Sequence, residues 1–348
     1  MSLIYRHLAW TKSPASEPDV VIASLARTLK VDSEGLSLVR PPLRNERSTL
    51  YFVGDVGTSV PRWVVKQTYP AAAIGSVPTL SAAAEFRSLA LLQSWQDIGA
   101  PVARPVGLLP DIDALVLEFV QGRLVGNHIA AHPCRRAPDT LQLFEAAGRY
   151  LRRVHDAGCA DETEVDLAEE ATVVLRRSTD ALSGVGLSLP TPVATALRRT
   201  PSRRVRIRRA LLYGDFVPVN LIATPSNQIV GIDPALQEIG MPEEDAARFV
   251  TFLVSNTRLM LGLVLPSVRR TSRELQEAFL SGWSGQPEPS TLLELRLLNA
   301  LTLRWLRRRE LTRLREAPAR ARRLVVDRFM ESLMVQVAGR LGHRSGRD

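Results

Sequence analysis

The chain has 348 residues, of which 45% are hydrophobic, and a formal net charge of +9. This length favours two domains or lobes with a substantial core, and two cysteines, Cys134 and Cys159, exclude a disulfide framework. The N-terminal residues lack a signal-peptide pattern, and the longest apolar run, residues 249–265, is short for a bilayer and contains Asn256 and Arg258. We therefore expect a cytoplasmic protein and a buried helix at residues 249–265.

Residues 1–18 are expected to form a loose arm, followed by a helix at 20–29 and strands at 36–39, 50–53 and 63–67. Gly54–Gly57 is typical of a hairpin turn between the last two strands. The loop before the second strand, Arg44–Thr49, contains no glycine. It still offers backbone N–H groups and the Ser48 hydroxyl, so we consider it as a loop that covers a phosphate.

Lys66 is unusual because the chain contains only three lysines and 42 arginines. It lies within the apolar strand at 63–67. A compact ammonium differs from a guanidinium in reach and hydration, and a site that needs one often rejects the other. The alternative is a lysine at a strand edge that extends its head to water.

Ser81 is a suitable N-cap for a helix from Ala82 to about Trp95, and Glu85 lies in its first turn, where the helix dipole alone favours a carboxylate. A further strand is predicted at 115–120. A helix then begins at Asp139 and ends before Gly158, and His155 near its end is expected to have a structural or capping role.

Three polar residues stand among apolar, strand-like runs in the segment 211–235: Asp215, Asn220 and Asp233. A hairpin through residues 223–228 would bring their side chains to one end of a small sheet. Individually they are typical of turns. Together they supply the groups that phosphoryl transfer needs. One carboxylate orients the acceptor hydroxyl, and an amide and a second carboxylate hold magnesium.

This spacing resembles that of the catalytic and metal loops of the protein-kinase-like superfamily, and the surrounding sequence motifs resemble those of its aminoglycoside phosphotransferase and choline kinase branch. The motifs are Tyr213-Gly214-Asp215, Asn220, Ile232-Asp233-Pro234 and Asp245-Ala246-Ala247. The branch usually has His where Tyr213 stands and a small or aromatic residue where Pro234 stands. The resemblance implies an α+β, bilobal protein-kinase-like fold. Its N-lobe, at 19–121, would hold a small antiparallel sheet with one main helix, and its C-lobe, at 122–348, would be mostly helical and hold the metal site.

The resemblance also implies roles for individual residues. Lys66, paired with Glu85, would bind the phosphates of ATP, and Ser48 would cover them. Backbone groups from Glu118 to Val120 would meet the adenine. Asn220 and Asp233 would hold Mg²⁺, and Asp215 would be the catalytic residue that receives the proton of the acceptor hydroxyl.

From Glu243 onward the sequence is typical of helices, with capping boxes expected at Thr271–Glu274 and Thr291–Glu294. Two arginine clusters stand out, seven arginines in 197–209 and ten in 296–323. We expect the second cluster to be mainly a solvated helix face, with Leu298, Leu301 and Trp305 turned inward. Peripheral contact of these C-terminal helices with an anionic membrane surface is the alternative.

The leading functional hypothesis is an ATP- and Mg²⁺-dependent kinase of a small-molecule hydroxyl, with a sugar or glycan-type acceptor favoured by the basic charge. One alternative is a catalytically weak kinase-like scaffold that binds a nucleotide or an anionic, lipid-linked partner. An antibiotic kinase that acts on an aminoglycoside or macrolide is a lesser one. We expect no nucleic-acid partner, because the arginine clusters lack interleaved aromatic residues and a recognisable binding module.

Overall fold

The computed structural model describes residues 16–45, 48–69, 80–131, 138–236, 238–256, 265–313 and 319–344. Most of the expected N-terminal arm, residues 46 and 47 of the expected phosphate loop, and Cys134 lie outside these ranges. The chain divides into two compact units. Unit 1 comprises Met1–Asp97, Pro101–Gly122 and Val230–Ala235, and unit 2 comprises Ile98–Ala100, Arg123–Ile229 and Leu236–Asp348.

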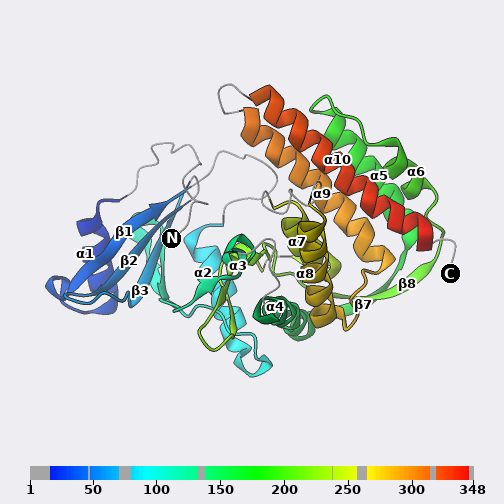
Figure 1. Cartoon of the computed structure of the whole chain (residues 1–348). Helices are drawn as coiled ribbons and strands as arrows, with labels where there is room; N and C mark the ends of the chain where they lie inside the picture. Colours follow the sequence, from blue (N-terminus) through cyan, green and yellow to red (C-terminus); the bar gives the residue numbers. More distant parts are fainter. Residues whose placement is uncertain are drawn as a thin grey trace. The chain divides into compact units, whose positions relative to one another are not determined.

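Unit 1 is built on an antiparallel sheet whose strands follow the order β1 (Leu36–Arg44), β2 (Ser48–Asp55), β3 (Trp63–Thr68), β5 (Ala114–Glu118) and β4 (Pro105–Leu109) (Figure 1). The three strands predicted before residue 68 are present, and each extends beyond its predicted range. The predicted strand at 115–120 is β5 and ends two residues earlier. Strand β4 was not predicted.

Each face of this sheet is covered by a helix. Helix α1 (Pro18–Leu29) contributes Val21 and Leu25 to a core shared with Val65 of β3. Helix α2 (Ala82–Ser94) contributes Leu89 to a core with Leu115 of β5 on the opposite face. Because successive residues of a strand point to opposite faces, the nearly continuous apolar runs of β3 and β5 supply both cores. Both helices are predicted by the sequence, at 20–29 and from Ala82 to about Trp95.

The segment Val230–Ala235 belongs to unit 1 although it is far along the chain. The N–H of Gly231 donates to the carbonyl of Pro101, and the N–H of Ala103 donates to the carbonyl of Gly231, both at 3.0 Å. These two bonds fix the segment beside residues 101–103. From the sequence this segment is predicted to lie with residues 122–348, because local patterns do not reveal where a returning strand docks.

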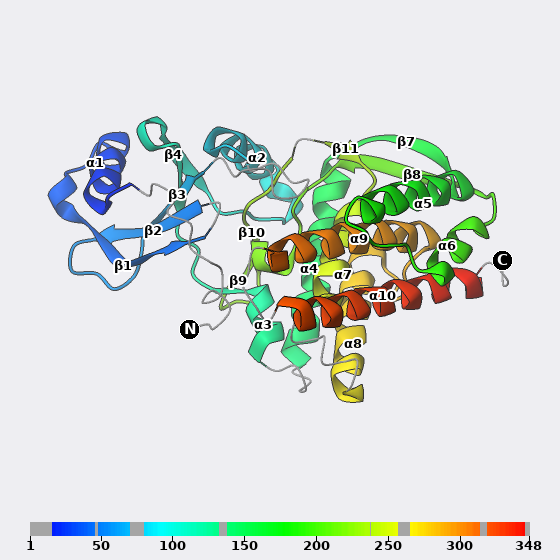
Figure 2. The same cartoon turned by 90° about the horizontal axis from the view of Figure 1, so that it is seen from above.

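Unit 2 is mainly helical, with long helices that run side by side (Figure 2). Its helices are α3 (Val125–Ala131), α4 (Pro138–Ala157), α5 (Leu167–Ser183), α6 (Thr191–Arg198), α7 (Glu243–Val254), α8 (Pro266–Ser284), α9 (Thr291–Arg313) and α10 (Ala319–Arg344). Its short strands are β6 (Arg123–Leu124), β9 (Leu221–Ala223) and β11 (Ile239–Gly240), and β10 (Ile229–Gly231) spans the point in the chain where unit 2 passes into unit 1. Within the described residues, no helix has the length and apolar character needed to cross a membrane.

The first arginine cluster supplies one strand of an antiparallel ladder that the sequence pattern does not predict. Strand β8 (Arg204–Leu211) pairs antiparallel with β7 (Cys159–Asp166). Cross-strand ion pairs join Arg206 to Glu162 at 2.5 Å and Arg209 to Asp161 at 3.3 Å. The acidic side chains of β7 therefore offset much of the positive charge of β8.

Three local predictions in the C-terminal half are wrong. The apolar helix predicted at 249–265 is part of α7, which ends at Val254, and residues 257–264 of the predicted range lie outside the described residues. Thr271 is inside α8, where its hydroxyl donates to the carbonyl of Ser267, because that helix already begins at Pro266. The N-cap of α9 is Ser290 rather than Thr291, since the Ser290 hydroxyl accepts from the N–H of Leu293 at 3.1 Å.

Helices α4 and α8 pack backbone against backbone through glycine. A Cβ atom added at Gly148 of α4 would lie 2.1 Å from the carbonyl oxygen of Phe279, and one added at Gly282 of α8 would lie 2.0 Å from that of Glu145. No side chain fits at such distances, so both glycines are required by the close approach. This contact fixes α4 and α8, which carry His155 and Trp283, at a defined separation.

Candidate active site

The loop between β8 and β9 carries two of the predicted site residues, Asp215 and Asn220. The amide nitrogen of Asn220 donates to the backbone carbonyl of Asp215 at 2.9 Å and to its carboxylate Oδ2 at 3.0 Å. Asn220 is buried, and Asp215 is half-buried. Because both bonds use Nδ2, the amide oxygen of Asn220 is the atom left to bind a cation.

The backbone just before Asp215 is held by a buried carboxylate. Asp245, in the first turn of α7, accepts from the N–H of Tyr213 at 2.6 Å and from the N–H of Gly214 at 3.0 Å. Gly214 has a φ of +87°, which a residue with a side chain rarely adopts. Asp245 therefore fixes the tight turn that presents Asp215.

A histidine and a tryptophan complete this network. His155 Nε2 lies 3.1 Å from Asp245 Oδ2, and the indole N–H of Trp283 donates to His155 Nδ1 at 3.3 Å. Since Nδ1 accepts, the proton of the neutral ring is on Nε2 and points to Asp245. The structural role predicted for His155 is confirmed, and its partner is a carboxylate 90 positions along the chain rather than the end of its own helix.

Tyr213, which stands where the resembling family has histidine, is fully buried. Its ring packs edge-on against Phe216, with centroids 5.2 Å apart, and against Tyr150 at 6.4 Å. Phe216 in turn packs against Phe249 of α7. Tyr213 and Phe216, on either side of Asp215, thus anchor the loop in an aromatic core, while Asp245 binds its backbone.

The other predicted cluster lies in unit 1. Lys66 of β3 donates to Glu85 Oε2 of α2 at 2.7 Å and also forms an ion pair with Asp233. Glu85 is 2% exposed, while the Asp233 side chain is 39% exposed and its backbone is left-handed with a φ of 60°. The predicted pairing of Lys66 with Glu85 is present, and the structure also brings Asp233 to the same ammonium.

Several polar groups of the predicted adenine-binding and phosphate-covering residues already make hydrogen bonds within unit 1. The N–H groups of Glu118 and Phe119 donate to the carbonyls of Arg104 and Arg62, each at 2.9 Å, and the Glu118 carboxylate pairs with Arg104. The N–H of Ser48 donates to Asn45 Oδ1 at 2.8 Å, and its hydroxyl to the same atom at 3.3 Å. Ser48 is buried, and its donors serve the turn between β1 and β2.

The second arginine cluster differs from the expected solvated face. Leu298, Leu301 and Trp305 are buried as predicted. Arg296, however, is also buried and pairs with Glu170 of α5 at 2.6 Å. Arg304 is half-buried, and its Nε donates to the hydroxyl of Ser255 at the end of α7 at 3.3 Å. The apolar periodicity of α9 was the available signal, but it does not show that its arginines face other helices.

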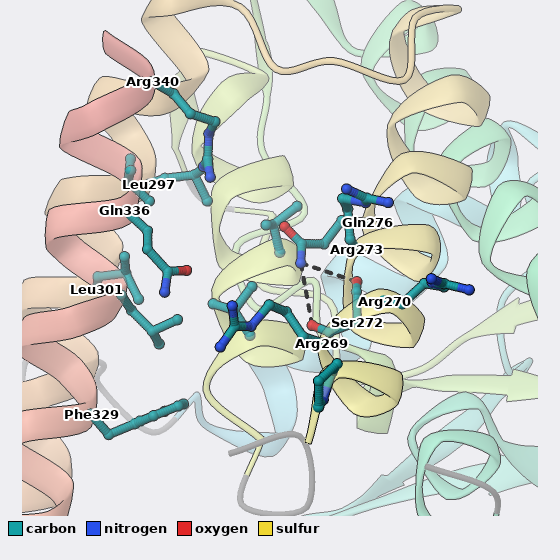
Figure 3. A pocket seen from close by; sticks show the side chains of 15 residues that line it. Arg269, Arg270, Ser272, Arg273, Gln276, Leu297, Leu301, Phe329, Gln336 and Arg340 are labelled. Atoms are coloured by element: carbon teal, nitrogen blue, oxygen red, sulfur yellow. Dashed lines mark hydrogen bonds between the residues drawn. The ribbon is translucent and has the colours of Figure 1, made fainter. Parts of the chain in front are cut away.

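A separate cavity of about 410 Å³ lies among α7, α8, α9 and α10 (Figure 3). Leu297, Leu301 and Phe329 give it apolar walls, and Arg269 and Gln336 contribute polar groups. Gln276, which also lines the cavity, donates to the carbonyl of Ser272 at 3.0 Å. The lining residues do not include Asp215 or Asn220.

The sequence pattern of the phosphotransferase enzyme family matches residues 39–288. No curated protein sequence matches the chain. The described residues include each of the sequence motifs that indicated this family, and the match covers well over half of the chain. The chain belongs to the phosphotransferase enzyme family.

Solved structures of small-molecule kinases share the fold. A glucosamine kinase in complex with glucosamine, ADP and inorganic phosphate is 18% identical, with a TM-score of 0.55, and the match covers 94% of this chain and 88% of that one. An amicoumacin kinase in complex with AMP-PNP, Ca²⁺ and Ami is 16% identical, with a TM-score of 0.53, and the match covers 91% of this chain and 94% of that one. An aminoglycoside phosphotransferase from Alicyclobacillus acidocaldarius is 14% identical, with a TM-score of 0.51 and 96% and 98% covered. At these identities the likeness establishes the fold, and it confirms the predicted α+β, kinase-like class.

Proposed function

We propose that this member of the phosphotransferase enzyme family is a kinase that transfers the γ-phosphoryl group of ATP to a hydroxyl of a small molecule, with a sugar or glycan-type acceptor favoured. The observation that carries the proposal is the ammonium of Lys66, held between Glu85 and Asp233. A lysine fixed by a buried glutamate next to a second carboxylate is the arrangement that orders a nucleotide's phosphates in kinases. The nucleotide complexes of the glucosamine and amicoumacin kinases support it.

Lys66 and Glu85 have distinct parts in this proposal. Glu85 Oε1 is buried and has no hydrogen-bond partner among the described residues, while Oε2 binds the lysine. The carboxylate is therefore oriented by Lys66 alone and holds the ammonium at the face of β3. Lys66 would bind the α- and β-phosphates from there. It is only 12% exposed, so water weakens this attraction little.

Adenine binding is proposed at the end of β5. The N–H groups of Glu118 and Phe119 are already used within unit 1. The carbonyl of Glu118 and the N–H of Val120 are the backbone groups we assign to the adenine edge. Ser48 stays a predicted phosphate contact that would require its hydroxyl to turn away from Asn45.

Asn220 and Asp233 are the proposed magnesium ligands, and their chemistry fits the ion. Mg²⁺ takes oxygen ligands from one or two protein groups together with substrate phosphates. Asn220 offers only its amide oxygen, because its nitrogen is fixed on Asp215. Asp233 offers a partly exposed carboxylate. When bound, the ion would neutralise negative charge on the phosphates.

Asp215 is the proposed catalytic residue. Asn220 donates to one oxygen of its carboxylate, and Gly214 before it is fixed by Asp245. The carboxylate is thus oriented before substrate binds, which is how an acceptor hydroxyl can be aligned for attack. As the O–P bond forms and the bond to the ADP oxygen breaks, the hydroxyl proton moves to Asp215.

The test is phosphate transfer from labelled ATP to a panel of sugars, amino sugars, aminoglycosides and macrolides, with and without Mg²⁺. Asp215→Asn is expected to lower kcat by about 10²- to 10⁴-fold, the usual contribution of a positioned base, and to leave the Kd for ATP nearly unchanged. Asp233→Asn is expected to weaken Mg²⁺-dependent ATP binding itself. Asp139→Asn, an exposed position at the start of α4, is the matched control.

The outcome decides between the proposal and its rivals. If Asp215→Asn and Asp233→Asn both keep wild-type turnover with a genuine acceptor, the assignment of Asp215 and Asp233 to the active site is wrong. ATP binding without transfer to any acceptor would favour a weakly active scaffold. Preferential labelling of aminoglycosides or macrolides would favour an antibiotic kinase.

A further inference from the structure

The cavity among α7, α8, α9 and α10 is formed by unit 2 alone (Figure 3). Its volume of about 410 Å³ falls within the range of about 300–1,000 Å³ that is usual for small-molecule sites. Helices α9 and α10 form two of its walls, and both follow residues 39–288, which match the family pattern. Membership of the family therefore does not assign an occupant to this cavity.

Helix α10 faces the cavity with one stripe of side chains, and the character of the stripe changes along the helix. The stripe includes Phe329, Leu333, Gln336 and Arg340, which are three or four positions apart and therefore share a face. Phe329 is buried, and Arg340 is exposed. At a rise of about 1.5 Å per residue, these two positions lie about 16 Å apart along the helix axis. This wall is therefore apolar at one end and carries a guanidinium at the other.

Helix α9 adds to the apolar end of the cavity. The start of α9 meets the last turns of α10, where Arg340 donates to Glu294. The later part of α9 meets the start of α10, where Trp305 donates to Asp327. The two helices are therefore antiparallel, and Leu301, which also lines the cavity, lies towards its apolar end. Because Leu301 is buried, apolar side chains from both helices line this end.

The opposite end offers hydrogen-bond donors that no described residue uses. The Nε of Arg340 donates to Glu294 Oε1 at 2.8 Å, and because Glu294 is fully buried, this bond fixes the guanidinium. The two terminal nitrogens of Arg340 donate to no described residue, and the side chain is 43% exposed. Gln336, one turn earlier, likewise makes no hydrogen bond to a described residue, and Figure 3 shows both side chains extending from α10 into the cavity. The described lining residues include no aspartate or glutamate, so no carboxylate of the wall would repel an anion there.

We propose that this cavity binds an amphiphilic anion, a single alkyl chain that ends in a carboxylate or a phosphate. The chain lies between Leu301 and Phe329, and the anionic head binds the terminal nitrogens of Arg340. Burial of the chain against apolar walls removes it from water, and a planar fork of N–H donors matches the paired oxygens of either head group. A neutral sugar or an inorganic anion would use only one end of the cavity. The inference is independent of the proposed function, because neither Asp215 nor Asn220 lines the cavity.

The first experiment measures binding of single amphiphiles to the full chain by calorimetry, with every ligand kept below the concentration at which it forms micelles. Decanoate, decyl phosphate, decanol, decylammonium, acetate and inorganic phosphate are compared. We expect decanoate or decyl phosphate to bind about 10-fold or more tightly than decanol, since hydrogen bonds to charged groups commonly contribute that much. Acetate and inorganic phosphate, which lack the chain, are expected to bind more weakly than the decyl anions. Comparison of decanoate with decyl phosphate distinguishes the two head groups.

Three variants of α10, each of which lowers the net charge by one, then locate the head group. Arg340→Gln is expected to remove the preference for the anions over decanol, and Gln336→Glu to weaken anion binding about threefold or more through repulsion. Arg328→Gln, at an exposed position that does not line the cavity, is the matched control and is expected to bind as the wild type does. Because Arg340→Gln takes a partner from the buried Glu294, its thermal unfolding is measured first. If that variant does not fold, Gln336→Glu decides, since Gln336 is exposed.

Equal affinity for decanol and the decyl anions, tighter binding of decylammonium, or no binding of any decyl compound would overturn the inference. An equal loss of anion binding in the Arg328→Gln control would show general attraction to a basic protein, and displacement of decyl phosphate by ADP would put the anion at the nucleotide site. Either result would also overturn it. Phosphate transfer from ATP enters none of these outcomes, so failure of the proposed function would leave the inference standing.

Discussion

The buried carboxylate of Asp245 provides the sharpest test of how the Asp215 loop is held. Its two oxygens receive the N–H groups of Tyr213 and Gly214 and face the Nε2–H of His155. Asp245→Asn keeps the size of the side chain but replaces one accepting oxygen by an NH₂ donor. Whichever way the amide turns, at least one of these donors then meets another donor.

The two orientations of the new amide differ in cost. An NH₂ group in place of Oδ2 would face both Tyr213 N–H and His155, and the ring could accept only by moving its proton to Nδ1, where the indole N–H of Trp283 already points. An NH₂ group in place of Oδ1 leaves only Gly214 N–H without an acceptor. This second orientation is therefore expected.

The magnitude follows from the loss of charge and of one acceptor. Hydrogen bonds to a charged group contribute about 1.5–3 kcal/mol, and a buried donor left unpaired costs about 1–3 kcal/mol. We expect Asp245→Asn to lower the free energy of unfolding by about 3–5 kcal/mol, a large part of a typical domain's stability. Because Gly214 immediately precedes Asp215, we also expect kcat to fall about 10- to 100-fold from misplacement of that carboxylate.

Urea unfolding and steady-state kinetics at saturating ATP check both numbers. The Kd for ATP is expected to stay within about twofold, because Lys66 and Glu85 lie in unit 1. Asp139→Asn is the control, since that carboxylate is exposed in the first turn of α4. An unfolding midpoint and a kcat for Asp245→Asn that equal those of the control would refute this account of the loop.

Two further variants test the packing and the charge of unit 2. Gly282→Ala is expected to lower the free energy of unfolding by about 3 kcal/mol or more, because its Cβ would lie 2.0 Å from the carbonyl of Glu145 and force α4 and α8 apart. Glu243→Gln is expected to stabilise the protein at pH 8 by about 1.4 kcal/mol for each unit by which burial raises the pKa of Glu243. The folded state binds that proton more tightly than the unfolded state, so wild-type stability falls as pH rises from about 4.5 through the raised pKa. The advantage of the variant should therefore shrink towards pH 4.5.

Each of these variants has a matched control. Gly339→Ala lies in α10, where an added Cβ meets nothing within 4 Å, and should stabilise by up to about 1 kcal/mol. If Gly282→Ala behaves like it, the helices are not in backbone contact. Glu169→Gln, at an exposed position in α5, should show no such pH-dependent gain. A stability difference for Glu243→Gln that is flat from pH 4.5 to pH 8 would contradict the sign argued above.

The site residues are predicted best where an unusual residue type stands in a clear local pattern of helix, strand or loop. Lys66 is a rare lysine in an apolar strand, and Glu85 is an early helical residue behind a serine cap; the structure joins them. The contact between Asp215 and Asn220 is equally predictable from the sequence, since their short spacing alone brings an amide next to a carboxylate. In both cases the residue types and short separations carry the information.

The features missed depend on contacts between distant segments. Strand β7 contains only one buried apolar residue, Val165, so it lacks the alternation that marks a strand, and its acids find arginines some 40 positions away. His155 and Asp245 meet through the docking of α4 and α7 on the same loop. Arg304 was read as part of a solvated face because charge on an amphipathic helix does not show what the helix packs against.

The distribution of arginines bears on the class of partner more than the net charge of +9 does. Binding to nucleic acid or to an anionic membrane relies on exposed, uncompensated arginines. On β8 the arginines face a ladder of acids, and on α9 Arg296 is buried against Glu170. Also on α9, Arg304 and Arg308 donate to the hydroxyl and the carbonyl of the buried Ser255. Arginines that are bound to other helices in this way are poorly placed to attract a polyanion, which favours a small-molecule partner over a nucleic acid or a membrane.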